Sequence, residues 1–260
     1  MNQRIPSKLI QALGEKTPLL IAVSGGQDSV TLLAAAHAAG IPVAAATIVS
    51  EFSVPGEAER VETFCRTHEI PWYPVYLSLL TISELRKNPE NRCYLCKKFL
   101  METLCALAKT KKYAAVCDGT HADDPVDGRP GMRALRELGI RSPFAESGIG
   151  KEGIYALGKE LGIPKIPSSS CLATRIPFGE EITGEKLEKI SRAEQYLRDN
   201  GISGVLRVRI VGDEAVIETE TAEVATARKL AGNMETIGFT RVRVAEYVIG
   251  GVQRWKQTQQ

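Results

Sequence analysis

The sequence lacks the features that mark membrane and secreted proteins. No apolar stretch approaches the roughly 20 residues that a membrane-spanning helix requires, and the stretch 34–46 is interrupted by His37, Gly40 and Pro42. The N-terminal residues 1–13 contain neither a continuous apolar segment nor a cleavage site of small residues, so they do not resemble a signal peptide. We therefore expect a cytoplasmic protein with no membrane partner.

The sequence also lacks an excess of charge of either sign. Its 33 basic and 31 acidic residues give a net charge of +2 over 260 residues. Without a global positive field, any nucleic-acid partner would have to bind a local patch, so the charge argues against obligatory RNA binding. Internal repeats and low-complexity segments are absent as well, and the length suits one large domain or two modest domains.

Short apolar or β-branched runs alternate with helical patterns in the first half of the chain. We expect strands at 19–23, 43–48, 72–76 and 114–117, and helices near 29–39, 57–68 and 96–109. This alternation predicts an α/β fold, in which helices cover both faces of a doubly wound parallel sheet. The ligand site of such a sheet lies beyond the carboxyl ends of its strands.

The pattern changes after residues 167–170. We expect a helix near 185–200, a β-hairpin of 205–210 and 215–219 joined at Gly212 and Asp213, a helix at 222–231 and a last strand at 241–248. These elements predict a small α+β domain. The expected domains are therefore 1–175 and 176–260.

The first expected strand runs directly into Ser24-Gly25-Gly26-Gln27-Asp28-Ser29, which opens the first helix. Paired glycines let backbone N–H groups approach an anion, and the helix directs its positive dipole end to the same point. No Lys-Ser or Lys-Thr pair follows the glycines, so this is not a Walker loop. The segment predicts a nucleotide-phosphate loop; the alternative is an ordinary glycine-rich turn.

A second loop, Asp118-Gly119-Thr120-His121-Ala122-Asp123-Asp124, follows the fourth expected strand. Carboxylates packed this closely repel one another unless donors or a cation compensate, and Mg²⁺ on a triphosphate would do so. Asp123 and Asp124 are the candidates for this contact. The alternative is an acidic turn that caps a helix, and for His121 we expect structural hydrogen bonds only.

The six cysteines fall into two groups. In a reducing compartment they favour metal binding or catalysis over disulfides. Cys93 and Cys96 form a C-x-x-C pair, and Cys171 lies in a polar segment beside a cation, where a reactive thiol would be accessible. Together the three thiols could bind three irons of a 4Fe-4S cluster, or a zinc with a fourth ligand, and the pair could also exchange disulfides. The remaining cysteines are expected to be structural: Cys65, Cys105 and Cys117.

Taken together, these motifs resemble the LarE family of ATP-dependent sulfur transferases, which belongs to the PP-loop ATP pyrophosphatases and has the adenine nucleotide alpha hydrolase-like fold. The resemblance spans nearly the whole chain and is carried by SGGQDS, DGTHADD, DGRPG at 127–131, Arg141-Ser142-Pro143, SSCLATRIPFG and Leu206-Arg207-Val208-Arg209. It implies that ATP adenylates a carboxylate of a pyridinium biscarboxylic acid mononucleotide. A sulfur source then converts that carboxylate to a thiocarboxylate for the nickel-pincer nucleotide cofactor of lactate racemase, with AMP and pyrophosphate as products. The resemblance also implies a homo-oligomer.

The resemblance assigns roles to individual residues. It implies that Cys171, Asp28 and Lys151 take part in catalysis, and that the ATP phosphates are held by Ser24, Gly25, Gly26, Asp28 and Ser29. Arg207 and Arg209 would bind the substrate phosphate, since positions i and i+2 of a strand project from one face. Alternatively, these arginines pair with Glu218 and Glu220 across the hairpin.

The three cysteines resemble one branch of this family in particular. In that branch, the residues matching Cys93, Cys96 and Cys171 are thought to hold a 4Fe-4S cluster that carries an extra sulfide, which would attack the acyl adenylate. In other relatives a single cysteine, matching Cys171, gives up its own sulfur. Three further alternatives stay open: a tRNA thiolase, an amidating PP-loop enzyme, and a non-catalytic nucleotide-binding module with structural zinc.

Overall fold

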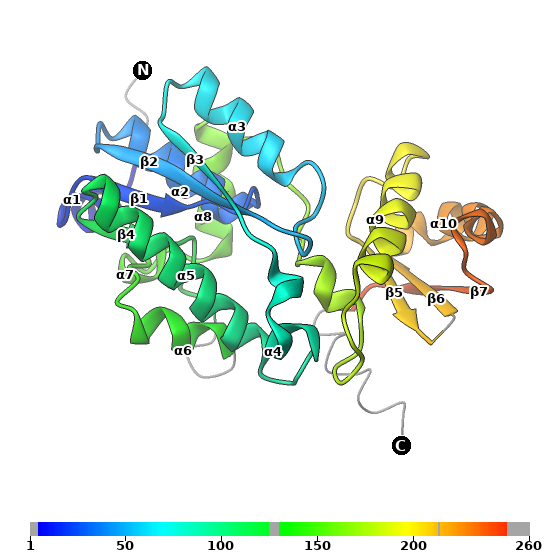
Figure 1. Ribbon diagram of the computed structural model, residues 1–260. Coiled ribbons are helices and arrows are strands. Elements are labelled where there is room, and N and C mark those ends of the chain that lie inside the picture. Colours follow the sequence, from blue (N-terminus) through cyan, green and yellow to red (C-terminus); the bar gives the residue numbers. More distant parts are fainter. Residues whose placement is uncertain (1–4, 125–129, 213, 249–260) are drawn as a thin grey trace. The chain divides into compact units, whose positions relative to one another are not determined.

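The computed structural model of the chain describes residues 5–124, 130–212 and 214–248 (Figure 1). Its contacts divide the chain into two compact units. The first, here called the N-terminal unit, comprises Met1–Val49, Gly56–Leu77 and Asn91–Ile166; the second, the C-terminal unit, comprises Ser50–Pro55, Ser78–Glu90 and Pro167–Gln260. The C-terminal unit thus combines the predicted α+β segment with two short segments from the first half of the sequence.

The N-terminal unit is built on a four-stranded parallel sheet. Its strands are β1 (Leu19–Ala22), β2 (Val43–Val49), β3 (Trp72–Tyr76) and β4 (Ala115–Cys117), in the order β3-β2-β1-β4. All four strands match the predicted ones, and the predicted α/β class is confirmed. The first three strands extend the sheet in one direction, whereas β4 pairs on the opposite side of β1. The topological switch point, where such sheets bind ligands, therefore lies between β1 and β4.

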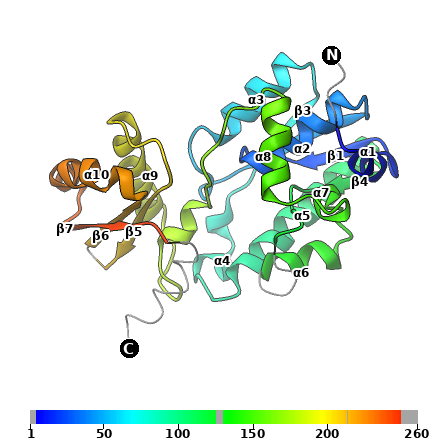
Figure 2. The same ribbon diagram turned by 180° about the vertical axis from the view of Figure 1, so that it is seen from behind.

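Helices cover both faces of this sheet (Figures 1 and 2). Because side chains alternate along a strand, Leu19 and Ile21 pack in one apolar cluster and Leu20 in another. The first cluster includes side chains of α1 (Ser7–Gly14), α2 (Gln27–Ala38), α3 (Glu57–Thr67), α7 (Pro143–Glu146) and α8 (Lys151–Glu160). The second includes side chains of α5 (Arg92–Lys111) and α6 (Pro130–Glu137).

The C-terminal unit contains a three-stranded sheet in the order β5-β6-β7. Strands β5 (Leu206–Val211) and β6 (Glu214–Thr219) form the predicted antiparallel hairpin, in which Arg207 is opposite Glu218; β7 (Arg241–Glu246) pairs parallel to β6. Asp213, one of the two predicted turn residues, lies outside the described residues, as do Asp127 and Arg129. The unit also contains α4 (Ser83–Arg86), α9 (Gly184–Asp199) and α10 (Val224–Ala231).

Backbone hydrogen bonds attach the two short early segments to the rest of the C-terminal unit. The amide of Leu172 donates to the carbonyl of Phe52, and the amide of Gly179 donates to that of Asn88. The buried Asn88 side chain in turn donates to the carbonyls of Ile176 and Pro177. Within the described ranges, no helix combines the length and apolar character that crossing a bilayer demands.

Candidate functional site

The loop between β1 and α2 is closed on itself by its own hydroxyl groups. The backbone amide of Ser24 donates to Oγ of Ser29 at 3.1 Å, and the two hydroxyls lie 3.3 Å apart. Gly25 has a φ of 83°, and its carbonyl accepts a 2.7 Å hydrogen bond from Arg60 of α3. Since Gly26 is the N-cap residue of α2, the first amides of that helix point toward the space at this loop.

Two loops meet beside this helix start. A Cβ atom at Gly119, after β4, would lie 2.8 Å from the backbone nitrogen of Ser29, a distance that real Cβ atoms essentially never show. Only glycine therefore allows the loop after β4 to approach α2 this closely. The two motifs that the sequence analysis singled out lie together, at the switch point between β1 and β4.

Lys151 reaches the loop Ser24–Ser29 from the start of α8. Its Nζ lies 2.5 Å from Oδ1 of Asp28, and both side chains remain about one-third exposed, at 34% and 29%. The backbone amide of Lys151 donates to Oδ2 of Asp123 at 2.6 Å, so the Asp123 carboxylate satisfies an amide at the start of α8. Asp123 thereby connects the acidic loop to the residue that contacts Asp28.

The other acids of the loop after β4 are engaged inside the protein. The buried Asp118 carboxylate accepts from Thr120, from Oγ of Ser142 at 2.8 Å and from Nζ of Lys97 at 3.3 Å. Asp124 is also buried, and its Oδ2 accepts from the backbone amide of His121. Asp28 and Asp123 are thus the more exposed carboxylates of these two loops.

Gln27 is a buried residue with a structural role, which its place in the motif did not indicate. Its Oε1 accepts a 2.9 Å hydrogen bond from the amide of Ile166, and its Nε2 donates to Thr31. The residue is 5% exposed, so it contributes to packing between α2 and the chain that follows α8. Sequence inspection also missed Lys97 and Ser142, because only the fold brings them to Asp118.

Cys93 and Cys96 lie in the first two turns of α5, three positions apart and thus on one face of the helix. Both residues are partly exposed. The guanidinium of the buried Arg92 lies 3.9 Å from Sγ of Cys93. The pair therefore presents two accessible thiols in a geometry that suits a shared metal centre or cluster.

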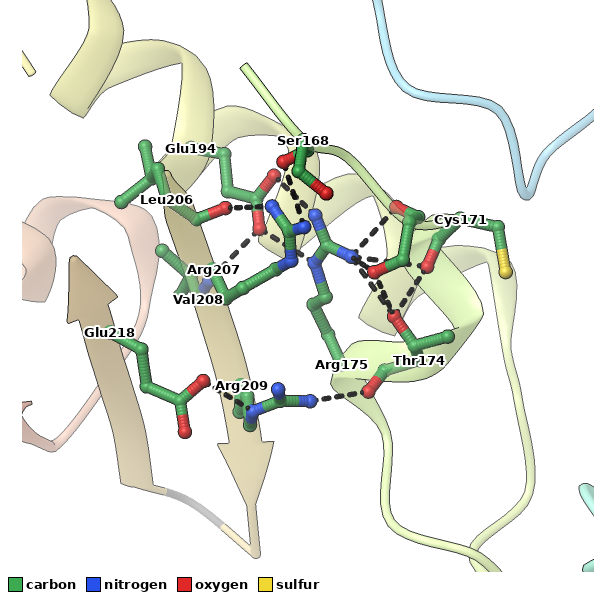
Figure 3. A network of polar contacts seen from close by, with 11 residues as sticks. Ser168, Cys171, Thr174, Arg175, Glu194, Leu206, Arg207, Val208, Arg209 and Glu218 are labelled. Carbon is green, nitrogen blue, oxygen red and sulfur yellow. Dashed lines mark hydrogen bonds and ion pairs between the residues drawn. The ribbon is translucent and has the colours of Figure 1, made fainter. Parts of the chain in front are cut away.

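Cys171, in the C-terminal unit, is exposed while its backbone is firmly held (Figure 3). It precedes the 3₁₀ helix Leu172–Arg175. Its carbonyl accepts from the amide and the hydroxyl of Thr174 and from Nη1 of Arg175. Its sulfur points away from this network (Figure 3), so the thiol is presented by a fixed backbone.

The two arginines of β5 have different environments. Arg209 forms a buried 2.9 Å ion pair with Glu218 and donates to the carbonyl of Thr174, as the alternative interpretation of the sequence expected for this residue. Arg207 instead donates to the carbonyls of Leu206 and Ser168 and lies against the Tyr247 ring. Among the described residues no carboxylate pairs with Arg207.

Burial has a measurable electrostatic consequence at Arg207. It lowers the pKa of this guanidinium to about 10, and the nearby positive charge of Arg175 contributes in the same direction. The nearby Glu194 carboxylate acts in the opposite direction, but it forms its ion pair with Arg175. A buried cation without an ion-pair partner of its own can gain from binding an anion. Arg207 is therefore the stronger anion-binding candidate of the two strand residues.

The three partly or fully exposed cysteines, Cys93, Cys96 and Cys171, are of the residue type that binds a 4Fe-4S cluster through thiolates. Cys93 and Cys96 belong to the N-terminal unit and Cys171 to the C-terminal unit. Over the part of the chain that the structure describes, no group of three or more histidine, cysteine, aspartate or glutamate residues is arranged to hold a metal ion.

Comparisons with known proteins give the family of the chain. No family model matches it. An uncharacterized protein of Synechocystis sp. is 40% identical over 218 residues, covering 81% of this chain and 79% of that protein. One of Methanocaldococcus jannaschii is 44% identical over 148 residues, covering 57% and 58%. The pyridinium-3,5-bisthiocarboxylic acid mononucleotide synthase of Lactiplantibacillus plantarum is 31% identical over 221 residues, covering 83% of this chain and 79% of the synthase. The chain therefore belongs to the family of this synthase, the LarE family.

Proposed function

We propose that the protein is an ATP-dependent sulfur transferase that converts a carboxylate of a pyridinium biscarboxylic acid mononucleotide to a thiocarboxylate, for nickel-pincer nucleotide synthesis. The observation that carries this proposal is the relationship to the Lactiplantibacillus plantarum synthase over 83% of the chain. The phosphate loop at the switch point of the N-terminal sheet supports the use of ATP.

The first half-reaction is adenylation. A substrate carboxylate oxygen forms a bond to the α-phosphorus of ATP, the bond between the α- and β-phosphates breaks, and pyrophosphate leaves. The loop Ser24–Ser29 and the start of α2 would hold the phosphates through backbone amides and hydroxyls. Lys151 would neutralise charge on them, and Asp28 and Asp123 are carboxylates of the class that Mg²⁺ takes as ligands.

The mononucleotide also carries a phosphate that needs a partner. Arg207 is the buried cation that an anion would compensate, and Arg209 follows on the same strand. The role of Arg209 in binding is secondary in this proposal, because Glu218 already neutralises its charge.

The second half-reaction transfers sulfur. The thiols of Cys93, Cys96 and Cys171 would bind three irons of a 4Fe-4S cluster, which would supply a sulfide as the nucleophile. The carbon–sulfur bond forms at the acyl adenylate, the bond to AMP breaks, and AMP leaves with the electron pair of that bond. Among these three cysteines, Cys171 is the exposed one, and its backbone is held by Arg175 and Thr174.

The test is to purify the protein without oxygen and to quantify iron, acid-labile sulfide and zinc per chain. We expect iron and sulfide in the amounts of one 4Fe-4S cluster, and repeated turnover when sulfide is supplied with ATP and the mononucleotide. Cys93→Ser, Cys96→Ser and Cys171→Ser should each lose iron and turnover. Cys105→Ser is the matched control and should retain both, because burial raises the pKa of that thiol and keeps it protonated.

Other outcomes would select other functions. A single turnover that leaves Cys171 lighter by the mass of H₂S would identify this residue as a sacrificial sulfur donor. Turnover with ammonia in the absence of iron and sulfide would favour an amidating enzyme, and thiolation of tRNA a tRNA thiolase. Tight ATP binding without pyrophosphate release, together with bound zinc, would leave a non-catalytic nucleotide-binding module.

A further inference from the structure

Arg175 is buried beside an exposed cysteine, and its guanidinium donates to the backbone and hydroxyls of the segment that carries this cysteine. The side chain has 0% relative exposure. Its Nη1 lies within 2.7 to 3.2 Å of four acceptors, all on residues that flank or include Cys171: the carbonyl and hydroxyl of Ser170, the carbonyl of Cys171 and the hydroxyl of Thr174. One buried cation therefore fixes the chain before and after the sulfur-bearing residue (Figure 3).

Glu194 of α9 completes this arrangement. Its two oxygens accept from Nε and Nη2 of Arg175 at 2.8 and 3.1 Å, and Oε1 also accepts from the amide of Val208 on β5. A buried guanidinium is costly unless it is paired in this way. The ion pair thus anchors the Cys171 segment to a helix and a strand of the same unit.

The neighbouring arginines act on the same segment but farther from the sulfur. Arg207 donates to the carbonyl of Ser168 and Arg209 to that of Thr174. Of these three arginines, Arg175 is the one that donates to the carbonyl of Cys171 itself. Its hydrogen-bond donors are engaged by Glu194 and by the backbone and hydroxyls of the segment, so Arg175 is poorly placed to bind a substrate anion without releasing them.

We propose that Arg175 and Glu194 are positioning residues, which hold the backbone at Cys171 so that its thiol is presented in one orientation for sulfur transfer. The catalytic part of this inference rests on the proposed function. The structural part does not, because it concerns the rigidity of the segment 168–176.

The test compares three variants with the wild-type protein. Arg175→Lys keeps the charge but loses the separate guanidinium nitrogens that donate to Glu194 and to the segment around Cys171. Glu194→Gln keeps the side-chain length and an oxygen that can accept from Val208, but removes the charge. Arg198→Lys is the matched control: this arginine also lies on α9 and donates to two backbone carbonyls, those of Ile202 and Gly204, away from Cys171.

The first readout is amide hydrogen exchange of the peptide 168–176. We expect exchange to be at least about tenfold faster in Arg175→Lys and Glu194→Gln, and unchanged in Arg198→Lys. The second readout is steady-state kinetics, in which the two variants should lose about tenfold in kcat with little change in KM for ATP or the mononucleotide. If Arg175→Lys does not fold, the isosteric Glu194→Gln carries the test.

Wild-type rates of exchange in both variants would overturn the positioning role. So would a higher KM for the mononucleotide at unchanged kcat, which would identify Arg175 as a substrate ligand. If the wild-type protein transfers no sulfur, the proposed function fails, but the exchange measurement still decides whether the pair fixes the segment.

Discussion

At the residue scale, charge compensation distinguishes Arg207 from Arg209, two arginines to which the sequence analysis gave the same role. Arg175 forms an ion pair with Glu194 and Arg209 with Glu218, whereas the hydrogen bonds of Arg207 go to backbone carbonyls and its guanidinium lies against a tyrosine ring. Strand alternation alone predicts that Arg207 and Arg209 share a face. It does not reveal which of them a glutamate neutralises, because that depends on side-chain conformation.

This difference predicts that alanine substitution of Arg207 impairs substrate binding, whereas alanine substitution of Arg209 impairs stability. Arg207→Ala should raise KM for the mononucleotide by about tenfold while leaving KM for ATP nearly unchanged, because a substrate-binding cation is lost. Arg209→Ala should instead lower the free energy of unfolding by about 3–5 kcal/mol, because the buried Glu218 loses its partner. Steady-state kinetics and urea unfolding measure the two effects, and the double variant Arg209→Ala/Glu218→Ala should recover part of the stability. Equal changes of both KM values in Arg207→Ala would contradict the assignment.

Burial distinguishes the cysteines in reactivity, as charge compensation distinguishes the arginines. Burial raises the pKa of Cys117 to about 12 and that of Cys65 to about 11, from an ordinary value of 9.0. Both thiols therefore stay protonated in the folded protein as the pH rises through 9, whereas an unfolded chain would release their protons. Their contribution to stability is present below pH 9 and is lost between pH 9 and their folded pKa values.

The burial and raised pKa values of Cys65 and Cys117 predict selective labelling of the exposed Cys171. Iodoacetamide at pH 8 should modify the exposed Cys171 at least about 100-fold faster than Cys65 or Cys117, since only an accessible thiolate reacts. Peptide mass mapping over time measures the rates, and labelling in urea provides the control in which all sites react. Comparable labelling of Cys117 in the folded protein would show that its strand opens readily.

At the scale of elements, the sequence predicted the strands whose formation depends on the local pattern of apolar and β-branched residues. The four parallel strands are apolar or β-branched runs. The two predicted loops, Ser24–Ser29 and Asp118–Asp124, meet at the carboxyl ends of β1 and β4. Helix α8 was missed because part of its N-terminal capping comes from Asp123, 28 positions earlier than Lys151. The segments 50–55 and 78–90 join the C-terminal unit through contacts such as Leu172 with Phe52, and no local pattern encodes such distant pairings.

The phosphate loop allows an element-scale prediction with an internal control. Gly25 and Gly40 both have positive φ, at 83° and 72°, but a Cβ at Gly25 would lie 2.5 Å from the carbonyl oxygen of Glu57. No described atom lies within 4 Å of a Cβ at Gly40. Gly40→Ala should therefore cost only the backbone strain, about 1–2 kcal/mol, whereas Gly25→Ala should cost about 2 kcal/mol more from overpacking and should weaken ATP binding.

Urea unfolding and ATP titration measure these two effects. The stability difference between the two variants isolates the contact between the phosphate loop and α3, because the strain is common to both. Equal stability would mean that the loop moves away from Glu57 at little cost. The loop would then be too compliant to hold phosphates in a fixed geometry.

At the scale of the whole molecule, the loop and lysine proposed for adenylation belong to one unit, whereas the three cysteines proposed for sulfur transfer come from both units. The loop Ser24–Ser29 and Lys151 lie in the N-terminal unit, whereas Cys171 lies in the C-terminal unit. Adenylation needs phosphate contacts and sulfur transfer needs a nucleophile, so we expect the two steps to be separable by substitution. Sequence motifs assigned residues to each step, but they did not reveal that Cys171 belongs to a different compact unit from Cys93 and Cys96.

Cys171→Ala tests this separation. We expect the variant to release a burst of pyrophosphate no larger than the amount of enzyme, because the acyl adenylate forms but is not discharged by sulfur. Added hydroxylamine should attack that acyl carbon, release AMP and yield a hydroxamate, which mass spectrometry detects. Asp28→Asn should abolish the burst, and Cys105→Ala should retain both steps. If Cys171→Ala releases no pyrophosphate, the thiol is required before adenylation, and the two steps are not separable by substitution.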